Sequence, residues 1–259
     1  MAKDAPLLDL RNISKAFGSV QALTDVDFEV KSGEVMALVG DNGAGKSTLI
    51  KCVAGIITHD KGEIFFDGKL ASIHGPKDAA KLGIEVVYQD LALCDNLDVV
   101  QNMFLGRERV QRLIPLAVEP LSEIEMEKQA LGVLESLRVT TIDSVRTKVA
   151  SLSGGQRQSV AISKAVMWNS KVVLLDEPTA ALGVAQTEQV LALIAQLREQ
   201  GLGVVVISHN LAEVLDVADR IVVLRLGRRA ATFERGEATP DDVVAAITGA
   251  RMLKIGGNR

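Results

Sequence analysis

The sequence predicts an α/β fold with a mostly parallel sheet, an N-terminal antiparallel β-subdomain and an inserted α-helical subdomain. Short apolar runs alternate with helix-like segments over most of the 259 residues. This pattern favours parallel strands covered by helices on both faces. Residues 7–31 instead show apolar alternation typical of antiparallel strands. From about residue 95 to 167, helical periodicity replaces the β-branched runs.

Composition narrows the class of protein. A net charge of -4 disfavours nucleic-acid binding, which usually needs a basic surface. No apolar run approaches the ~18 residues of a membrane span, and the N-terminus lacks the apolar core of a signal peptide. Cys52 and Cys94 form no C-x-x-C motif, so we expect two buried, reduced thiols. We therefore expect a soluble protein whose membrane role, if it has one, is peripheral.

The first ninety residues are expected to open with two or three antiparallel strands that turn at Phe17-Gly18-Ser19. Strands are then expected over 35–39, 62–68 and 84–88, and helices from Leu49 and over 76–82.

The inserted segment contains its own helix signals. Ser122 and Glu125 have the spacing of a capping box, and Pro115 and Pro120 should break the stretch before it. The predicted buried face of this helix consists of Ile124, Leu131, Leu134 and Leu137.

After the insertion, the α/β pattern returns. Strands are expected over 172–175, 204–207 and 221–224. Helices are expected around an apolar stripe at 190–197, over 210–218, and after Thr239-Pro240. We expect residues 7–250 to form one domain, with the helical subdomain at about 95–167, followed by a loose tail at 251–259.

A glycine-rich loop follows the strand at 35–39 and precedes a helix, and it matches the pattern G-x(4)-G-K-[ST]. Glycines let backbone N–H groups turn inward around phosphate oxygens, and the helix N-terminus adds positive potential. Lys46 can reach the β- and γ-phosphates, and the Ser47 hydroxyl can hold Mg²⁺. The loop therefore predicts a nucleoside-triphosphate site in a P-loop NTPase core, built from Gly40, Asn42, Gly43, Ala44, Gly45, Lys46, Ser47 and Thr48.

Two carboxylates end the strand at 172–175. Asp176 can hold Mg²⁺ at a strand end beside a phosphate loop. Glu177, one residue further, can act as general base on the attacking water. The alternative is a solvated pair of acids, and the upstream phosphate loop favours the catalytic interpretation.

A second candidate anion site begins a helix at Ser153-Gly154-Gly155. Ser at the N-cap and two glycines offer donors at a helix N-terminus. Taken alone, this is an ordinary junction between a loop and a helix.

Together, these motifs resemble those of ATP-binding cassette (ABC) ATPases, in the same order and with similar spacing over about residues 7–249. Gly40 to Ser47 is similar to Walker A, Leu152 to Gln156 to the LSGGQ signature, and Leu174 to Glu177 to Walker B. Gln89 matches the Q-loop and His209 the switch histidine.

The resemblance implies a composite ATP site between two cassettes paired head to tail. Lys46, Ser47, Asp176, Glu177, Gln89 and His209 would act on one side, with Gln89 and His209 joining Glu177 in catalysis and Gln89 also near Mg²⁺. Ser153, Gly154 and Gly155 would donate to the γ-phosphate from the other subunit. The resemblance also places Phe17 against adenine, with Val20 nearby; plain turn-flanking packing of Phe17 is the alternative.

One position departs from the family. After Pro178-Thr179-Ala180-Ala181-Leu182, the family usually has an aspartate that orders the site across the dimer, and Gly183 stands there instead. Since Glu177 is intact, we still expect hydrolysis.

Residues 83–93, 102–108 and 178–182 resemble the monosaccharide-importer branch of the family. This implies permease subunits in the membrane, a cassette on its cytoplasmic face, a periplasmic sugar-binding protein acting indirectly, and no nucleic acid. The single cassette would act as a homodimer or pair with a second cassette. Another importer or exporter subunit, or a soluble non-transport ABC ATPase, remains open.

Overall fold

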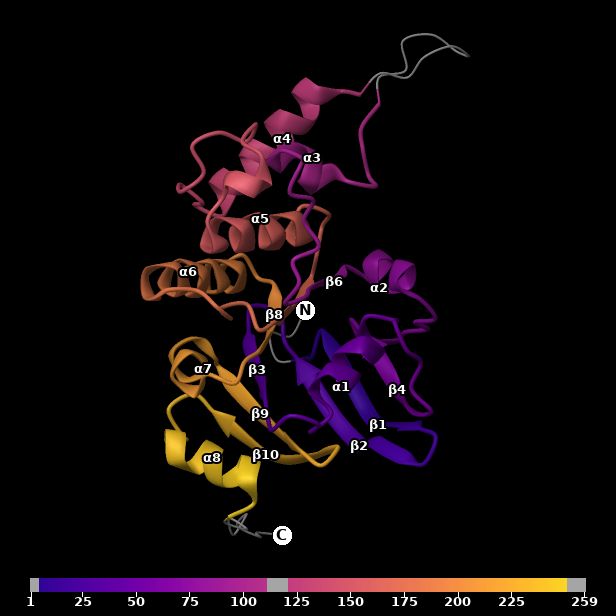
Figure 1. Ribbon diagram of the computed structural model, residues 1–259. Helices are drawn as coiled ribbons and strands as arrows, with labels where there is room; N and C mark the ends of the chain where they lie inside the picture. Colours follow the sequence, from indigo (N-terminus) through magenta and orange to yellow (C-terminus); the bar gives the residue numbers. More distant parts are fainter. Residues whose placement is uncertain (1–4, 111–120, 251–259) are drawn as a thin grey trace.

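The computed structural model describes residues 5–110 and 121–250. In these residues, an antiparallel sheet and a mostly parallel sheet lie side by side, and a group of helices stands at one end of the parallel sheet (Figure 1). The predicted α/β class with an antiparallel N-terminal sheet is confirmed. The predictions for Pro115, Pro120 and the tail at 251–259 lie outside the described residues.

The N-terminal sheet has the strand order β2-β1-β4-β5 and is antiparallel throughout. Alternate residues of β1, including Leu8 and Leu10, are fully buried. Phe28 on β2 and Ile64 on β4 pack in the same core cluster. The strands are β1 (Leu8–Phe17), β2 (Val20–Val30), β4 (Lys61–Phe66) and β5 (Lys69–Leu70).

The larger sheet has the order β10-β9-β3-β8-β7-β6, and only β9 and β10 pair antiparallel. Its strands are β3 (Val35–Val39), β6 (Ile84–Val87), β7 (Val172–Asp176), β8 (Gly203–Ile207), β9 (Arg220–Arg225) and β10 (Arg228–Glu234). The sequence did not predict β10. This edge strand has no buried residue, so it lacks the apolar alternation that marks the others.

Five helices accompany the two sheets: α1 (Lys46–Val53), α2 (Pro76–Leu82), α6 (Val184–Glu199), α7 (Leu211–Val217) and α8 (Pro240–Thr248). The predicted stripe on α6 is buried at Val190, Leu193, Ile194 and Leu197. The predicted helix after Thr239-Pro240 is present as α8, and Thr239 forms a reciprocal capping box with Asp242 at its start.

The inserted segment holds α3 (Val99–Phe104), α4 (Glu123–Ser136), a 3-10 turn (Val149–Ser151) and α5 (Gly154–Val166). These form a separate hydrophobic cluster in which Phe104, Met126 and Val160 are buried. The Phe104 and Trp168 rings meet edge to face, with their centroids 5.6 Å apart. The predicted helical subdomain is thus present as a distinct packing unit.

The predicted buried face of α4 is wrong in part. Ile124 is 83% exposed and Leu131 49%, whereas Met126, Ala130 and Leu134 point inward at i, i+4 and i+8. The true face is narrower and rotated, because α4 packs mainly on α3. Ser122 is the N-cap, but its hydroxyl donates to the Glu125 carboxylate at 3.3 Å and makes no capping bond to the backbone.

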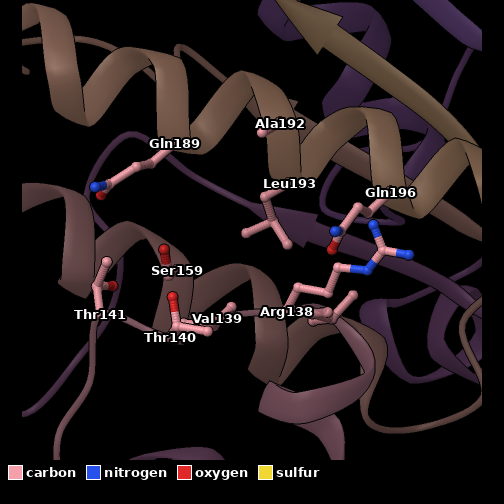
Figure 2. Close-up of a pocket in the computed structure, with 10 residues that line it drawn as sticks. Arg138, Val139, Thr140, Thr141, Ser159, Gln189, Ala192, Leu193 and Gln196 are labelled. Carbon is pink, nitrogen blue, oxygen red and sulfur yellow. The ribbon is translucent and has the colours of Figure 1, made fainter.

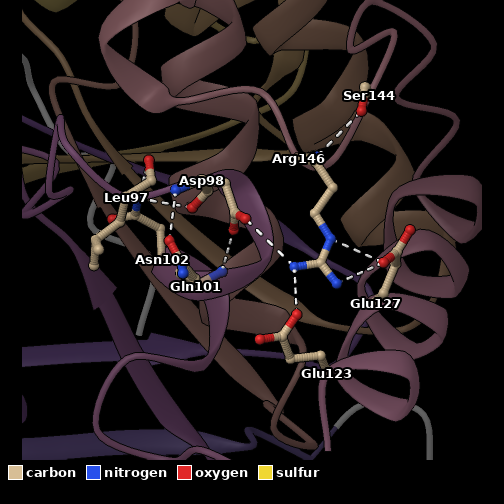
Figure 3. Close-up of polar contacts among 8 residues, drawn as sticks. All are labelled: Leu97, Asp98, Gln101, Asn102, Glu123, Glu127, Ser144 and Arg146. Atoms are coloured by element: carbon tan, nitrogen blue, oxygen red, sulfur yellow. Dashed lines mark hydrogen bonds and ion pairs between the residues drawn. The ribbon is translucent and has the colours of Figure 1, made fainter. Parts of the chain in front are cut away.

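A charged network joins the start of α3 to α4 (Figure 3). The Arg146 guanidinium lies 2.7 Å from Glu127, 3.2 Å from Glu123 and 3.5 Å from Asp98. Asp98 also caps α3 by accepting from the Gln101 backbone N–H at 2.7 Å. One arginine therefore ties two helices of the subdomain together.

The seam between the helical subdomain and the parallel sheet runs between α5 and α6. A cavity of about 180 Å³ lies there, with Ser159 on α5, Gln189 and Leu193 on α6, and Thr140 and Arg138 from the segment after α4 around it (Figure 2). The seam is therefore incompletely filled.

Cys52 is buried, as predicted, and burial raises the pKa of its thiol to about 11. Cys94 is only half-buried, so the prediction for that thiol is wrong. It lies on an irregular segment before α3, where its backbone bonds to the side chain of the buried Asn102. Across residues 5–110 and 121–250, none of the helices is both long and apolar enough to cross a membrane.

Candidate nucleotide-binding site

The glycine-rich loop follows β3 and leads directly into α1. Gly40 has φ 150° and Gly45 has φ 104°, a region that favours glycine. A Cβ at Gly40 would lie 2.2 Å from the Leu224 carbonyl oxygen, and one at Gly45 would lie 2.8 Å from that of Ala22. Both conformation and space therefore require these two glycines.

Segments far away in the sequence hold the loop. The Ala44 N–H donates to the Asp41 carbonyl at 3.0 Å within the loop. The Gly227 N–H donates to the Ala44 carbonyl at 3.1 Å, and the Gly227 carbonyl accepts from Thr24 at 2.7 Å. The turn after β9 and strand β2 thus fix the loop from outside. The sequence analysis missed this support, because nothing local marks Gly227 as a neighbour of the loop.

Lys46 bends back onto the loop. Its Nζ donates to the Gly40 carbonyl at 2.6 Å and to the Asp41 carbonyl at 3.0 Å. Ser47 is exposed at the first turn of α1, where helix N–H groups have no intrahelical partner. Asn42 and Gly43 are also exposed, Thr48 is half-buried and Ala44 is buried. The loop therefore holds the Lys46 ammonium close to the exposed first turn of α1, an arrangement that can bind an anion.

Asp176 stands at the carboxyl end of β7. Burial raises the pKa of its carboxyl, the neighbouring Glu177 charge adds to this, and the Lys46 and Lys51 cations oppose it. Burial also raises the pKa of Tyr88, with a further contribution from Asp176. Asp176 thus lies within electrostatic reach of both the phosphate loop and the segment that leads to Gln89, whose own side chain is exposed.

Glu177 and His209 form a direct pair. The Glu177 N–H donates to the Ile207 carbonyl at 2.9 Å, which fixes the ends of β7 and β8 together. His209 Nδ1 then lies 2.8 Å from Glu177 Oε2, and the Glu177 side chain is only 17% exposed while that of His209 is 78% exposed. Adjacent strand ends therefore place an acid and an imidazole at one spot.

The tip of the β1–β2 hairpin exposes an aromatic ring. Phe17 pairs with Val20 across the turn, and the two side chains are 50% and 64% exposed. The Lys15 ammonium lies 5.6 Å from the centre of the Phe17 ring. An exposed, rigid ring of this kind is available for stacking on a base.

The Ser153-Gly154-Gly155 motif starts α5 with the N-cap that its sequence predicts. The Gln156 N–H donates to Ser153 Oγ at 3.3 Å, and the Ser153 N–H donates to Gln156 Oε1 at 2.8 Å. A Cβ at Gly154 would lie 2.9 Å from Leu182 Cδ2. In the described residues, the close neighbours of this motif belong to the β7–α6 turn rather than to the phosphate loop.

The predicted residues thus fall into two groups. Lys46, Asp176, Glu177 and His209 gather at the carboxyl ends of β3, β7 and β8, the usual ligand edge of such a sheet. Ser153 to Gly155 stand on α5 in the helical subdomain. Neither group contributes to the cavity of Figure 2. The fold and the first group define a P-loop nucleotide-binding protein.

Comparison with known proteins gives the family. The profile of the ABC transporter family matches residues 23–180. The chain is 47% identical to the fructose import ATP-binding protein FrcA of Rhizobium meliloti, over 95% of both chains. It is 42% identical to the xylose/arabinose import ATP-binding protein XylG of Sulfolobus acidocaldarius, over 96% of both. The chain therefore belongs to the ATP-binding proteins of ABC transporters and is an ATPase of that type.

Three further comparisons bear on the organisation and fold of the protein. The ribose import ATP-binding protein RbsA 2 of Rhizobium etli is 40% identical over 96% of this chain, which spans 48% of that longer protein. A nucleotide-free ATP-binding cassette from an ABC transporter superposes with a TM-score of 0.79 at 27% identity, covering 92% of this chain and 98% of that one. A dimeric ATP-binding cassette bound to ADP and Pi superposes with a TM-score of 0.70 at 28% identity, covering 88% of this chain and 98% of that one. The predicted fold class is confirmed.

Proposed function

We propose that this chain is the ATP-hydrolysing subunit of a membrane importer for a monosaccharide. It acts at the cytoplasmic face of the membrane with permease subunits, and a periplasmic sugar-binding protein delivers the sugar to the permease. The similarity to fructose, xylose/arabinose and ribose import proteins supports the substrate class. The observation that carries hydrolysis is the Glu177–His209 pair beside the phosphate loop.

The phosphate loop binds the triphosphate. When ATP binds, the Lys46 ammonium leaves the carbonyls of Gly40 and Asp41 and donates to β- and γ-phosphate oxygens. These oxygens are negatively charged, so they form stronger hydrogen bonds with the ammonium than neutral carbonyls do. Backbone N–H groups from Asn42 to Thr48 complete the cradle. Phe17 stacks on adenine and Val20 packs beside it, since both are exposed at the hairpin tip.

The donor set fits Mg²⁺. Ser47, Gln89 and Asp176 offer a hydroxyl, an amide oxygen and a carboxylate, which are hard oxygen ligands. Burial is the main cause of the raised pKa of Asp176, and a bound cation would favour the charged form of this carboxyl. In the described residues, no cluster of three His, Cys, Asp or Glu could hold a metal. Phosphate oxygens and water would complete the coordination of the ion. When bound, the ion would neutralise phosphate charge.

Glu177 is the general base. Its carboxylate is shielded from solvent and held next to His209, so it can accept a proton from the attacking water. His209 and Gln89 act with it: the imidazole contacts the γ-phosphate and helps to position the water, and Gln89 approaches from the β6 side. The Glu177 backbone has a positive φ of 51°, an uncommon conformation for a residue other than glycine, which supports a constrained placement of this side chain.

The site is completed by a second copy of the chain. Ser153, Gly154 and Gly155 of one subunit donate to the γ-phosphate bound by the other, because the fold places this motif on α5, against the β7–α6 turn of its own subunit. A solved cassette of similar fold is dimeric, which supports the pairing of two copies. We further propose that residues 7–250 act as one domain, with the helical subdomain at about 95–167.

The loop is tested with Lys46→Ala. ATP affinity measured by calorimetry should fall at least tenfold, about 1.4 kcal/mol, because the phosphate charge is left without its cation. Lys69→Ala, an exposed lysine on β5, is the matched control and should bind normally. Retained affinity in Lys46→Ala would contradict the assignment of the loop.

Import is tested in the native host. A strain that lacks this chain should lose uptake of one labelled monosaccharide, and the intact chain should restore it while Lys46→Ala should not. Unchanged uptake of fructose, xylose, arabinose and ribose would overturn the sugar-import proposal and leave another transported substrate.

A further inference from the structure

A glutamate on α7 joins the two segments that carry the proposed catalytic pair. Glu213 lies on the first turn of α7, four residues after His209. Its Oε2 accepts a hydrogen bond from the Thr179 hydroxyl, and its Oε1 accepts one from Asn210 Nδ2 at 2.7 Å. Thr179 stands two residues after Glu177, and Asn210 directly follows His209. One carboxylate therefore bridges the segments that follow β7 and β8.

The Thr179 end of this bridge is held firmly. Thr179 is only 8% exposed. The Ala180 N–H donates to the Glu177 carbonyl at 3.1 Å, and the Leu182 N–H donates to the Thr179 carbonyl at 3.2 Å. These two overlapping turns link Thr179 closely to Glu177, so a displacement of one would move the other.

The Asn210 end is held by further hydrogen bonds. The Asn210 N–H donates to Oγ of the buried Ser208 at 3.0 Å. The Asn210 Oδ1 accepts from the Ala212 N–H at 3.2 Å and so caps α7. His209 lies between Ser208 and Asn210, so the chain is fixed on both sides of it, although the His209 side chain is 78% exposed.

A carboxylate suits this bridging position. Backbone pairing between β7 and β8 extends to the Glu177 N–H and the Ile207 carbonyl, and beyond this pair the Glu213 side chain joins the two segments. A carboxylate accepts from two donors at once, and its charge strengthens both hydrogen bonds. Glu213 is half-buried, which limits competition from water.

We propose that Glu213 is a positioning residue for ATP hydrolysis. By bridging Thr179 and Asn210, its carboxylate keeps Glu177 and His209 together in the geometry that turnover requires. The inference rests on the catalytic pair proposed above, and it adds a residue that acts through the two segments rather than on the nucleotide.

Steady-state kinetics test the bridge. Glu213→Ala should lower kcat for ATP hydrolysis about tenfold or more, because small displacements of catalytic groups are costly. The calorimetric affinity for ATP should change by less than about twofold, since the phosphate loop that binds the triphosphate is intact. Glu188→Ala, which removes an exposed glutamate of α6, is the matched control and should keep the parental kcat.

The conservative variant separates the bridge from the charge of the residue. In Glu213→Gln, the amide oxygen can accept from Asn210, and the amide nitrogen can donate to the Thr179 hydroxyl, which is able to accept. Both hydrogen bonds are thus available, and kcat should remain within about twofold of the parental value.

Thr179→Val breaks the bridge at its other end. Valine keeps the shape of the side chain but removes the hydroxyl, so kcat should fall as it does in Glu213→Ala. The double variant should lose no more than Glu213→Ala alone, because both changes break the same contact. Additive losses would show that the two residues act separately and would overturn the inference.

The imidazole resonances give a direct measure of position, since the chain has three histidines, His59, His74 and His209. In NMR spectra of the nucleotide-free protein, the His209 resonance, assigned with His209→Gln, should shift in Glu213→Ala and stay near its parental position in Glu213→Gln. The resonances of His59 and His74 should not change, whereas a general loss of the fold would shift all three.

The outcomes distinguish the bridge from the catalytic pair. A Glu213→Ala chain with the parental kcat would overturn this inference, and so would a lowered kcat with an unshifted His209 resonance. If Glu177→Gln loses turnover in the same assay, the catalytic pair proposed above still stands. If Glu177→Gln and Glu213→Ala both keep the parental kcat, both proposals fall.

Discussion

At the scale of single residues, the ends of β7 and β8 concentrate the chemistry. Asp176 and Glu177 are adjacent in sequence, yet their surroundings differ. Asp176 is half-buried. Burial and the Glu177 charge raise the pKa of its carboxyl, and the Lys46 and Lys51 cations offset this only in part. The Glu177 backbone N–H donates to the Ile207 carbonyl of β8, and the Glu177 carboxylate lies 2.8 Å from His209 Nδ1. Two acids can therefore serve two roles, one towards a cation and one towards water.

Glu177→Gln should keep ATP binding and lose turnover. The amide retains the size of the side chain but cannot accept the proton of the attacking water. Steady-state hydrolysis should fall at least a hundredfold, within the range for loss of a general base, while the calorimetric affinity for ATP changes little. Glu188→Gln, at an exposed glutamate on α6, provides a comparison that should keep its turnover. Unchanged hydrolysis in Glu177→Gln would exclude this residue as the base.

Asp176→Asn should stabilise the nucleotide-free protein at neutral pH. Because the pKa of this carboxyl is raised on folding, the folded state favours the protonated form, and stability is lost as the pH rises through the folded pKa. Asparagine does not ionise, so the variant would not lose this stability as the pH rises. The melting temperature at pH 7 should therefore exceed that of the parent chain, and the difference should shrink towards the ordinary aspartate pKa of about 3.9.

The same variant should lose the Mg²⁺ dependence of ATP binding, which separates the role of Asp176 from its effect on stability. An Asp176→Asn chain with parental Mg²⁺ dependence would show that the ion is held elsewhere.

At the scale of elements, the sequence predicted strands better than helix faces. Buried parallel strands such as β3 and β8 are continuous apolar runs, so each can be identified from its own short stretch of sequence. The orientation of α4 depends on which neighbour covers it. Ile124 and Leu131 have helical spacing with Leu134, yet α3 covers the side that carries Met126 and Ala130. A periodic pattern identifies a helix but does not choose between two partly apolar faces.

Arg146→Ala should loosen the helical subdomain. It removes the cation that lies among Asp98, Glu123 and Glu127 and leaves three carboxylates together. Exposed ion pairs of this kind contribute about 1 kcal/mol, or roughly 2–4 °C in Tm for a chain of this size. The loss in Tm by scanning calorimetry should shrink in 1 M NaCl, where screening is strong. Arg138→Ala, an exposed arginine that lines the cavity beside α6, should change Tm less.

At the scale of the whole molecule, the sequence predicted which candidate site residues gather at one edge of the sheet, but not the contacts that support them. Lys46, Asp176, Glu177 and His209 each follow a predicted strand, and parallel strands bring their carboxyl ends to one edge. The supporting contacts could not be predicted. Leu224 and Gly227 touch the phosphate loop only because β9 lies beside β3. The order of strands in a sheet cannot be predicted from the local sequence of each strand.

The purified chain should be monomeric without nucleotide and dimeric with it. The two groups of residues proposed to contact the γ-phosphate lie in separate parts of one subunit, so we expect the nucleotide to supply much of the attraction between two copies. Light scattering of Glu177→Gln should give the monomer mass without ATP and twice that mass with ATP and Mg²⁺. A stable dimer without nucleotide would show that protein contacts alone suffice.

The contact of Lys46 with its own loop has a consequence for the turnover cycle. The ammonium rests on the carbonyls of Gly40 and Asp41, and distant strands hold the loop in shape. Binding and release of nucleotide would then require the Lys46 side chain to change its hydrogen-bond partners, while the backbone of the loop keeps its conformation. With the function proposed above, each departing product would leave the phosphate loop already in shape, so that only the half of the site from the second copy would have to be added again.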